Sequence, residues 1–537
     1  MRSKAVVGVV LALILMVVAS GFSGAFAVPQ GTQETIAVAK VSAAIEDATG
    51  QAKYVFVFIG DGMAVAQRNA AELYLAATRG AERPEEAKLV MNTFPAQGMN
   101  TTYDLSSVIP DSASTATAIA SGHKTKSGVI GMDADGKVSY ENISEIAKKN
   151  GWKVGVISSV SLDHATPAAF YAHEVSRKNM YDIATQLVNS GFDYFAGGQI
   201  LQNEQEGKPG IYDLAKERGF TVTVGPEEFA TITAESAPVL AMSEKVDEDA
   251  AMNYTLDGTD ISLAQFVAKG IDVLDNPDGF LMMIEGGKID WACHANDAAA
   301  SVLDTLALDA AVSEAVKFYE QHPDETLIIV TGDHETGGMT IGFAGTQYSS
   351  FVDKIENQKM SYIEFGNKLA EYKETHTADD AKFEDVLPLI QEAFGLYVLT
   401  ADEKTALEQA IADGKSEGAS DEAKKAGKDA ENTLCYSMAL TDLELKVLEE
   451  AFHNSMLGQE ERASDDYTYL LYGGYEPLAV KCTTVLNNKA GIGWTSYSHT
   501  GVPVQTSALG IDAELFNGYY DQTDIYNKMI QATGFGS

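Results

Sequence analysis

Short apolar runs alternate with stretches of helical spacing from Lys53 to about Thr340. Four of the runs are uninterrupted, as in strands that are buried on both faces: Tyr54–Ile59, Lys153–Ser158, Gly279–Ile284 and Thr326–Thr331. The stretches between them predict helices over Asn142–Asn150, Lys178–Ser190 and Ala298–Gln321. This alternation predicts an α/β fold, a three-layer α/β/α sandwich with a largely parallel central sheet.

Acidic residues directly follow three of the four predicted strands. Asp61 lies between two glycines after the first strand, Glu285 follows the third, and Asp333 with His334 follows the fourth. In open parallel sheets the chemistry lies at the carboxyl ends of the strands. We therefore expect these side chains to face one cleft.

The composition changes after about Gly345, where Ala, Glu, Lys and Asp dominate and strand signals become few. We interpret 346–489 as a mainly helical inserted domain, placed between the first part of the core, 28–345, and its return over 490–537. Two capping boxes, Thr400–Glu403 and Thr441–Glu444, each predict the start of a helix. The charged stretch Lys415–Lys428 between them is predicted to be a solvated linker.

The first 27 residues have the features of a secretory signal peptide. Arg2 and Lys4 precede an apolar run, and Ala25–Ala27 forms a small-x-small cleavage site. We expect residues 1–27 to be removed and the protein to be exported, to the periplasm or out of the cell. No later stretch approaches the roughly 20 uninterrupted apolar residues of a membrane span, so none is predicted.

The chain is strongly acidic, with 38 Lys+Arg against 77 Asp+Glu and a net charge of −39 over 537 residues. This charge argues against nucleic acid as a binding partner. It is consistent with a saline environment and equally with an ordinary acidic exported protein. Of the three cysteines, Cys435 and Cys482 either pair or stay free, and Cys293 is expected to be a small buried apolar residue.

Several Asp and His residues are spaced as metal ligands are. Asp290 and His294 share one face if the chain is helical from Ile289 onward, and Asp333 and His334 add an oxygen and a nitrogen donor. Mixed Asp/His sets suit catalytic Zn²⁺ and all-oxygen sets suit Mg²⁺, so two kinds of site are implied. Histidines far from acidic strand ends are expected to be structural, namely His123, His173, His322, His376 and His453.

The run Asp111–Ala118 consists of small residues and follows Pro110, which predicts the beginning of a helix. The hydroxyl of Ser112 would then lie at the positive end of the helix, where an anion is favoured. Ser and Asp are also ordinary N-cap residues, so this pattern by itself favours a structural cap.

Six motifs resemble those of the alkaline phosphatases and occur in the order found in that family. They are Gly60–Met63, Asp111–Ala118, His164–Ala168 with Arg177 downstream, Glu285–Asp290 with His294, Thr331–Gly338, and His499–Gly501. Together they cover about 53–345 and 490–537. The resemblance implies that the protein hydrolyses phosphate monoesters with broad specificity and releases inorganic phosphate.

The resemblance also implies a role for each matching residue. Ser112 is expected to be the nucleophile that becomes a phosphoserine, Arg177 to clamp two phosphoryl oxygens, and Asp111 to orient Arg177. The implied ligands are Asp290, His294 and His499 for one Zn²⁺, Asp61, Asp333 and His334 for a second Zn²⁺, and Asp61, Thr166 and Glu285 for Mg²⁺.

Two positions depart from the best-known bacterial pattern, which has aspartate where this chain has His164 and lysine where it has Trp291. Both residues are expected beside the metal ligands rather than among them. His164 leaves the identity of the third metal open. The loss of an ammonium at Trp291 predicts weaker binding of the phosphate product and, where release limits turnover, a higher kcat.

A phosphodiesterase or sulfatase built on the same metal scaffold is the alternative enzyme. Sulfatases need a modified Cys or Ser in a different motif, which is absent here, and diesterases usually use Thr as the nucleophile. A non-catalytic binder of phosphate or zinc would not need Ser112 together with Arg177. Small phosphate monoesters are thus the expected partners. A homodimer is possible, and the insert is a lid, a crown, a dimer contact or a decoration.

Overall fold

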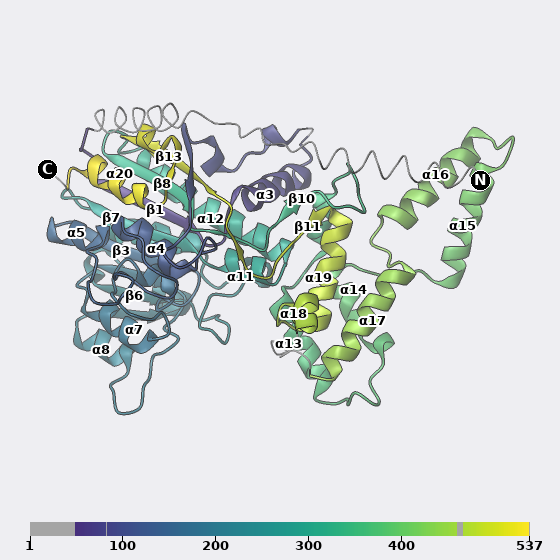
Figure 1. The fold of residues 1–537 in the computed structure, drawn as a ribbon, viewed down its shortest axis with the longest axis horizontal. Helices are drawn as coiled ribbons and strands as arrows, with labels where there is room; N and C mark the ends of the chain where they lie inside the picture. Colours follow the sequence, from purple (N-terminus) through teal and green to yellow (C-terminus); the bar gives the residue numbers. More distant parts are fainter. Residues whose placement is uncertain (1–48, 82, 459–465, 536–537) are drawn as a thin grey trace, which may run out of the picture. The chain divides into compact units, whose positions relative to one another are not determined.

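The computed structural model describes residues 49–81, 83–458 and 466–535. Within them the core is a ten-stranded sheet of order β14-β2-β13-β8-β1-β7-β3-β4-β6-β5 (Figure 1). Its strands are β1 (Tyr54–Gly60), β2 (Ala96–Thr101), β3 (Lys153–Ser158), β4 (Tyr194–Gly197), β5 (Thr221–Val224), β6 (Val239–Met242), β7 (Phe280–Gly286), β8 (Thr326–Gly332), β13 (Val504–Gly510) and β14 (Gly518–Asp521). The predicted signal peptide lies outside the described residues.

The sheet is largely parallel, as predicted. Strand β13 runs antiparallel to β2 and β8, and the other neighbouring pairs are parallel. The four predicted strands are β8, β1, β7 and β3, which stand side by side at the centre of the sheet and are almost wholly buried. The six strands that flank them were not predicted, because they are short or, like β2, rich in polar residues and glycine.

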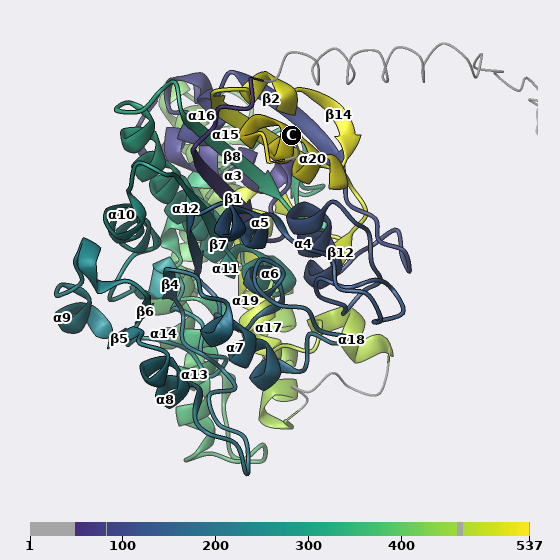
Figure 2. The same ribbon diagram turned by 90° about the vertical axis from the view of Figure 1, so that its left-hand side faces the viewer.

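Helices cover both faces of the sheet and confirm the three-layer sandwich (Figure 2). One face carries α10 (Leu263–Leu274) and α12 (Ala298–Tyr319), with α3 (Val65–Thr78) packed against α12. The other face carries α4 (Ser112–Ser121), α5 (Ile143–Lys149), α6 (Ala165–Ala168) and α20 (Thr523–Thr533). The predicted helices correspond to α5, α7 (Met180–Asn189) and α12, each within two residues at either end. Shorter helices α8 (Ile211–Glu217) and α9 (Gly225–Phe229) lie near β5.

The chain leaves the core through β10 (Thr340–Ile341) and returns through β11 (Ile492–Gly493), which pair antiparallel and form a neck. The described part between them is built from helices, with a hydrophobic cluster of its own that includes Phe365, Ile390 and Phe452. These helices are η5 (Val352–Asn357), α13 (Tyr362–Lys373), α14 (Phe383–Phe394), α15 (Ala401–Lys415), α16 (Asp421–Tyr436), α17 (Asp442–Met456), α18 (Asp466–Tyr472) and α19 (Pro477–Ala490). The neck lies just outside the predicted limits of the insert, 346 and 489.

Both predicted capping boxes are present, with Thr400 at the start of α15 and Thr441 at the start of α17. The prediction that Lys415–Lys428 is a linker is wrong. Lys415 ends α15, and most of the stretch belongs to α16, which Ser420 caps by accepting a hydrogen bond from the backbone N–H of Ala423 at 3.1 Å. Gly414 and Gly427 let the two helices pack closely, so a charged composition here marks an exposed helical hairpin rather than coil.

Cys293 and Cys482 are free thiols and buried, and the side chain of Cys435, the possible disulfide partner of Cys482, lies outside the described residues. The expectation that Cys293 is a buried apolar residue is confirmed. Among the described helices, none combines the length and apolar character that a bilayer span requires.

Candidate active site

The carboxyl ends of the three central strands bring acidic side chains together. Gly60 is in register with Gly286 and Gly332, so β1, β7 and β8 end level with one another. Asp61, Glu285 and Asp333 stand at these ends and are fully buried. Burial raises the pKa of all three carboxyls, that of Glu285 to about 7, and burial together with the charge of Asp290 raises the pKa of Asp333 to about 8. A bound cation would favour the ionised form of carboxyls placed in this way.

Helix α11 (Lys288–His294) carries Asp290 and His294 on one face, as predicted, with His294 Nε2 3.4 Å from Asp290 Oδ2. A short strand, β12 (His499–Thr500), pairs with β9 (Glu335–Thr336) and brings the end of the chain to this helix. As a result, Nε2 of His499 lies 3.1 Å from Nε2 of His294.

The hydrogen bonds of these two imidazoles fix their tautomers. His294 donates from Nδ1 to the carbonyl of Tyr497 at 2.7 Å, and His499 donates from Nδ1 to the carbonyl of Pro110 at 2.7 Å. When neutral, each imidazole has a single N–H, which the carbonyl takes up, so each Nε2 then carries a lone pair directed toward the other ring. Burial also lowers the pKa of His499, which disfavours protonation of its Nε2 as a way for one ring to donate to the other. A metal cation between the two nitrogens could bind both of them.

His334 forms a second set of donors beside the first. Its Nε2 lies 3.3 Å from Asp61 Oδ1 and 3.3 Å from Asp333 Oδ2. Ligand atoms at zinc's usual distance of about 2.0–2.1 Å are about 3.3 Å apart around a tetrahedral ion, so the spacing in both sets fits zinc. The ring of His334 stacks on that of His499 with centroids 3.6 Å apart, and the two sets are therefore adjacent.

Ser112 is the first residue of α4 and only 2% exposed, and its Oγ lies 3.2 Å from His334 Nε2. The N-cap of α4 is its neighbour Asp111, whose Oδ1 accepts from the backbone N–H of Ser114 at 3.1 Å. The capping role left open by the sequence therefore belongs to Asp111, and the hydroxyl of Ser112 faces the metal donors.

Arg177 is held from two sides. One terminal nitrogen donates to Asp111 Oδ2 at 3.0 Å, and the other donates to His164 Nε2 at 3.0 Å. The backbone N–H of Gly128 also donates to Asp111 Oδ2, at 3.0 Å, so Asp111 is itself fixed. These bonds set the plane of the guanidinium, whose side chain remains 26% exposed.

Asp61, His164 and Glu285 form a third group, in which one donor atom from each lies within 4.8 Å of the others. Thr166 adds a hydroxyl that donates to Asp61 Oδ2 at 3.3 Å. Among the described residues, Asp61 Oδ1, Glu285 Oε1 and His164 Nδ1 are buried without a hydrogen-bond partner. Burial and the charge of Arg177 lower the pKa of His164 to about 3, which keeps the imidazole neutral. A cation fits the two carboxylate oxygens, and a water bound to that cation can accept the hydrogen on Nδ1 of His164, since Nε2 already accepts from Arg177.

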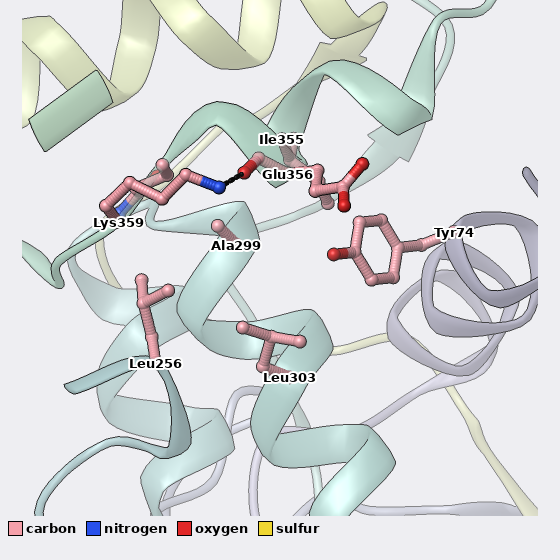
Figure 3. A pocket seen from close by; sticks show the side chains of 8 residues that line it. Tyr74, Leu256, Ala299, Leu303, Ile355, Glu356 and Lys359 are labelled. Carbon is pink, nitrogen blue, oxygen red and sulfur yellow. Dashed lines mark hydrogen bonds between the residues drawn. The ribbon is translucent and has the colours of Figure 1, made fainter. Parts of the chain in front are cut away.

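A pocket of about 210 Å³ lies elsewhere, between α3, α12 and η5 (Figure 3). Apolar Leu256 and Leu303 line it together with Tyr74, and Lys359 is tied to the backbone of its own loop through the carbonyl of Glu356 at 2.6 Å. None of the residues that line this pocket is a metal donor, so the candidate active site is the donor cluster at the carboxyl ends of β1, β7 and β8.

A family model described as alkaline phosphatase matches residues 52–204 and 233–535. The chain belongs to the alkaline phosphatase family. Alkaline phosphatase 4 of Bacillus subtilis is 28% identical over 500 residues, which are 92% of this chain and 91% of that protein. A cold-active alkaline phosphatase from a psychrophilic Shewanella species has a similar structure, with a TM-score of 0.66, 26% identity and coverage of 89% of this chain and 99% of that one. The Thermus thermophilus enzyme shares the fold, with a TM-score of 0.65 and 23% identity.

As a member of the alkaline phosphatase family, the chain hydrolyses phosphate monoesters. The residues selected from the sequence lie at the carboxyl ends of the central strands. They form three adjacent groups, of which the first and second share His334 and the second and third share Asp61. Trp291 supplies no donor atom to them. Its ring meets that of His164 edge to face, with centroids 5.9 Å apart, so it backs the histidine that accepts from Arg177.

Supporting residues were missed by the sequence analysis. Thr115 donates to Asp333 Oδ2 at 3.1 Å, Thr336 donates to Asp290 Oδ1, and Ser158 donates to Glu285 Oε2. Glu335 organises its loop by accepting from the backbone of Met339 and from Gln67. Thr115, Thr336 and Glu335 lie inside quoted motifs, whereas Ser158 is only the last residue of a predicted strand.

Proposed function

We propose that this family member hydrolyses small phosphate monoesters of broad specificity through a phosphoserine on Ser112, at a site of two zinc ions and one magnesium ion. The observation that carries the proposal is the pair of imidazoles of His294 and His499, whose Nε2 lone pairs face each other at 3.1 Å. Directly beside this pair, the hydroxyl of Ser112 lies 3.2 Å from the nitrogen of a third donor, His334.

The donor chemistry fits two zinc ions. Asp290, His294 and His499 would hold one, and Asp61, Asp333 and His334 would hold the other. When bound, zinc lowers the pKa of a serine hydroxyl or a water and stabilises the oxygen that leaves phosphorus. The four buried carboxylates and their histidines are otherwise an uncompensated acidic cluster, which supports the same assignment.

The chain's own residues bind and orient the phosphoryl group. Ser112 Oγ attacks phosphorus, so that an Oγ–P bond forms while the bond from phosphorus to the alcohol oxygen breaks. Arg177 presents a planar fork of donors to two phosphoryl oxygens, and Asp111 holds that fork in place. Water then cleaves the Oγ–P bond, which returns the serine and releases inorganic phosphate.

Asp61, Thr166 and Glu285 would hold the third ion, and their oxygen atoms suit Mg²⁺. His164 would compete for the assignment only if its ring gave up the bond from Arg177, because Nε2 accepts that bond and the ring's single hydrogen therefore lies on Nδ1; a free nitrogen donor would favour Zn²⁺ or Co²⁺. Magnesium remains our assignment, since His164 already accepts from Arg177 through Nε2. Metal analysis of the purified protein, with His164→Asp as the comparison, distinguishes the two.

We also propose that residues 1–27 direct export, to the periplasm or out of the cell, and that nucleic acid is not a partner. The basic start, apolar run and cleavage site support the first point, and the charge of −39 supports the second. A homodimer is proposed on the family resemblance alone.

The direct test compares p-nitrophenyl phosphate with bis(p-nitrophenyl) phosphate at alkaline pH, before and after EDTA treatment and after return of Zn²⁺ and Mg²⁺. We expect strong monoester turnover, loss of that turnover in EDTA, and recovery with both metals. A preference for the diester would assign the scaffold to phosphodiesterase chemistry, and turnover indifferent to EDTA would exclude the metal site.

A further inference from the structure

The loop between β11 and β12 connects the insert to the metal donors. The carbonyl of Tyr497 accepts the Nδ1 hydrogen of His294 at 2.7 Å and so directs Nε2 toward His499. Groups that hold the second nitrogen of a ligating histidine in this way control its orientation and its affinity for metal. The position of the Tyr497 backbone therefore sets the position of His294.

The side chain of Tyr497 extends to the insert. Its hydroxyl donates to the carbonyl of Leu471, in the last turn of α18, at 2.8 Å. The next residue repeats the link, because Ser498 Oγ lies 3.2 Å from the hydroxyl of Tyr469 in the same helix.

Helix α18 is itself anchored in the insert. Tyr472 is buried in the insert's hydrophobic cluster and its hydroxyl accepts from Asn454, in α17, at 2.8 Å. Lys481, in α19, donates to the same Leu471 carbonyl at 2.6 Å. Removing the Tyr497 hydroxyl therefore leaves that carbonyl satisfied and the helix in place.

The ring of Tyr497 packs against Gly473. Gly473 has φ +65°, and a Cβ built there would lie 2.3 Å from Cγ of Tyr497. The backbone conformation and the close approach both require glycine. A side chain at this position would push the ring, and with it the carbonyl that holds His294.

We propose that Tyr497 is a positioning residue through which the insert fixes His294 and thereby the retention of metal at that site. The inference rests on the proposed function in one respect, namely that His294 is a metal ligand. It gives part of the insert a role in the chemistry, although the insert supplies none of the proposed metal ligands.

The test is the rate at which zinc leaves the holoenzyme for a chromogenic chelator, compared between the wild type and Tyr497→Phe. Because supporting groups of metal ligands change affinity by about 10- to 100-fold and Tyr497 acts one step further out, we expect a roughly 3- to 10-fold faster release of one zinc. Excess Zn²⁺ should restore kcat, with KM for the substrate unchanged.

Tyr54→Phe is the matched control. Tyr54 is the first residue of β1, at the amino ends of the strands and so on the far side from the proposed ligands. Its hydroxyl also donates to a backbone carbonyl, that of Asn276, at 3.2 Å. We expect its zinc release to match the wild type. Equal release from Tyr497→Phe and Tyr54→Phe would overturn the proposal.

Gly473→Ala gives a second variant that moves the ring while keeping the hydroxyl. It should release zinc at least as fast as Tyr497→Phe, and wild-type release from a folded Gly473→Ala protein would also contradict the proposal. If the proposed function itself is wrong, the result is distinguishable, because the purified wild-type protein would then contain no zinc to release.

Discussion

The α/β core and the helical insert are built differently although one chain forms both. In the core, β1, β7 and β8 are buried along their whole length, and the proposed ligands stand at or near their ends. In the insert, α15 buries none of its residues, and it packs against α16 along a narrow seam of small residues. The proposed ligands therefore lie in the buried core, whereas the exposed helix α15 carries none of them.

The insert is not uniform in this respect. In the part of the chain that the structure describes, the hairpin of α15 and α16 makes no hydrogen bond to a proposed ligand, whereas α18 reaches His294 through Tyr497. In α19, Asn487 donates to the carbonyl of Asn296, two residues beyond His294, at 2.7 Å. The insert thus has a supporting half, which includes α18 and α19, and a peripheral half, the hairpin of α15 and α16. Changes in the two halves should alter activity and zinc release to very different extents.

The largest effect belongs to Ser112, at the centre of the core site. Ser112→Ala removes the attacking oxygen while the metal donors and the N-cap Asp111 remain. We expect kcat/KM for p-nitrophenyl phosphate to fall by about 10³-fold or more, with zinc content unchanged. Activity within tenfold of the wild type would remove Ser112 from the mechanism.

A smaller effect is expected at Arg177, at the rim of the same site. Arg177→Lys keeps the positive charge but loses the planar fork that Asp111 and His164 orient. We predict a loss of about 10- to 100-fold in kcat/KM and weaker inhibition by inorganic phosphate. Unchanged phosphate inhibition would mean that the guanidinium does not bind the phosphoryl group.

The metal-free core should be less stable at alkaline pH. Folding raises the pKa of Glu285 to about 7 and that of Asp333 to about 8, so the folded state holds protons that the unfolded state has released. Stability therefore falls as pH rises through these values. Between about pH 7.5 and 8.5, where histidines are largely neutral in both states, the loss from these two groups is roughly 1 kcal/mol.

Thermal melts of the metal-free and zinc-loaded proteins across this range measure the difference. The zinc-loaded protein should depend less on pH than the metal-free protein, because bound metal keeps the ligand carboxylates ionised in the folded state, whereas Asp304, whose pKa burial raises to about 7 away from the site, titrates in both. A metal-free melting temperature that stays level or rises with pH would contradict the assignment of these buried carboxyls as metal ligands.

The smallest effect is expected in the peripheral half of the insert. The base of the hairpin is closed by backbone bonds of Tyr397 to Met438 and Leu440, at 3.3 and 2.8 Å, so a short Gly/Ser linker can replace residues 401–436. We predict kcat/KM within twofold of the wild type and unchanged zinc release. A tenfold loss would show that the hairpin takes part in substrate access or assembly.

Much of this organisation could be predicted from the sequence, for physical reasons that differ by region. Strands buried on both faces, such as Tyr54–Gly60, leave unbroken apolar runs, and residues at their ends could be placed from the parallel topology alone. The flanking strands β2 and β14 leave no such run, because polar residues and glycine interrupt β2 and two of the four residues of β14 are exposed.

The limits at the site have a similar origin. Spacing on one helix predicted that Asp290 and His294 act together, but only the pairing of β12 with β9 brings His499 to them. The link from Tyr497 to Leu471 depends on tertiary packing between the insert and the return strand, and neither residue has a motif of its own. Lys415–Lys428 was misread because alternating charges are typical both of coil and of an exposed helix.

The most direct test of the central claim is to trap the covalent intermediate. The protein would be mixed with a phosphate monoester, quenched in acid within one turnover, digested, and its peptides analysed for phosphate by mass spectrometry. The account predicts phosphate on Ser112 in the zinc-loaded wild type and none after EDTA treatment or in Ser112→Ala. Phosphate on another residue, or full turnover with none on Ser112, would contradict it.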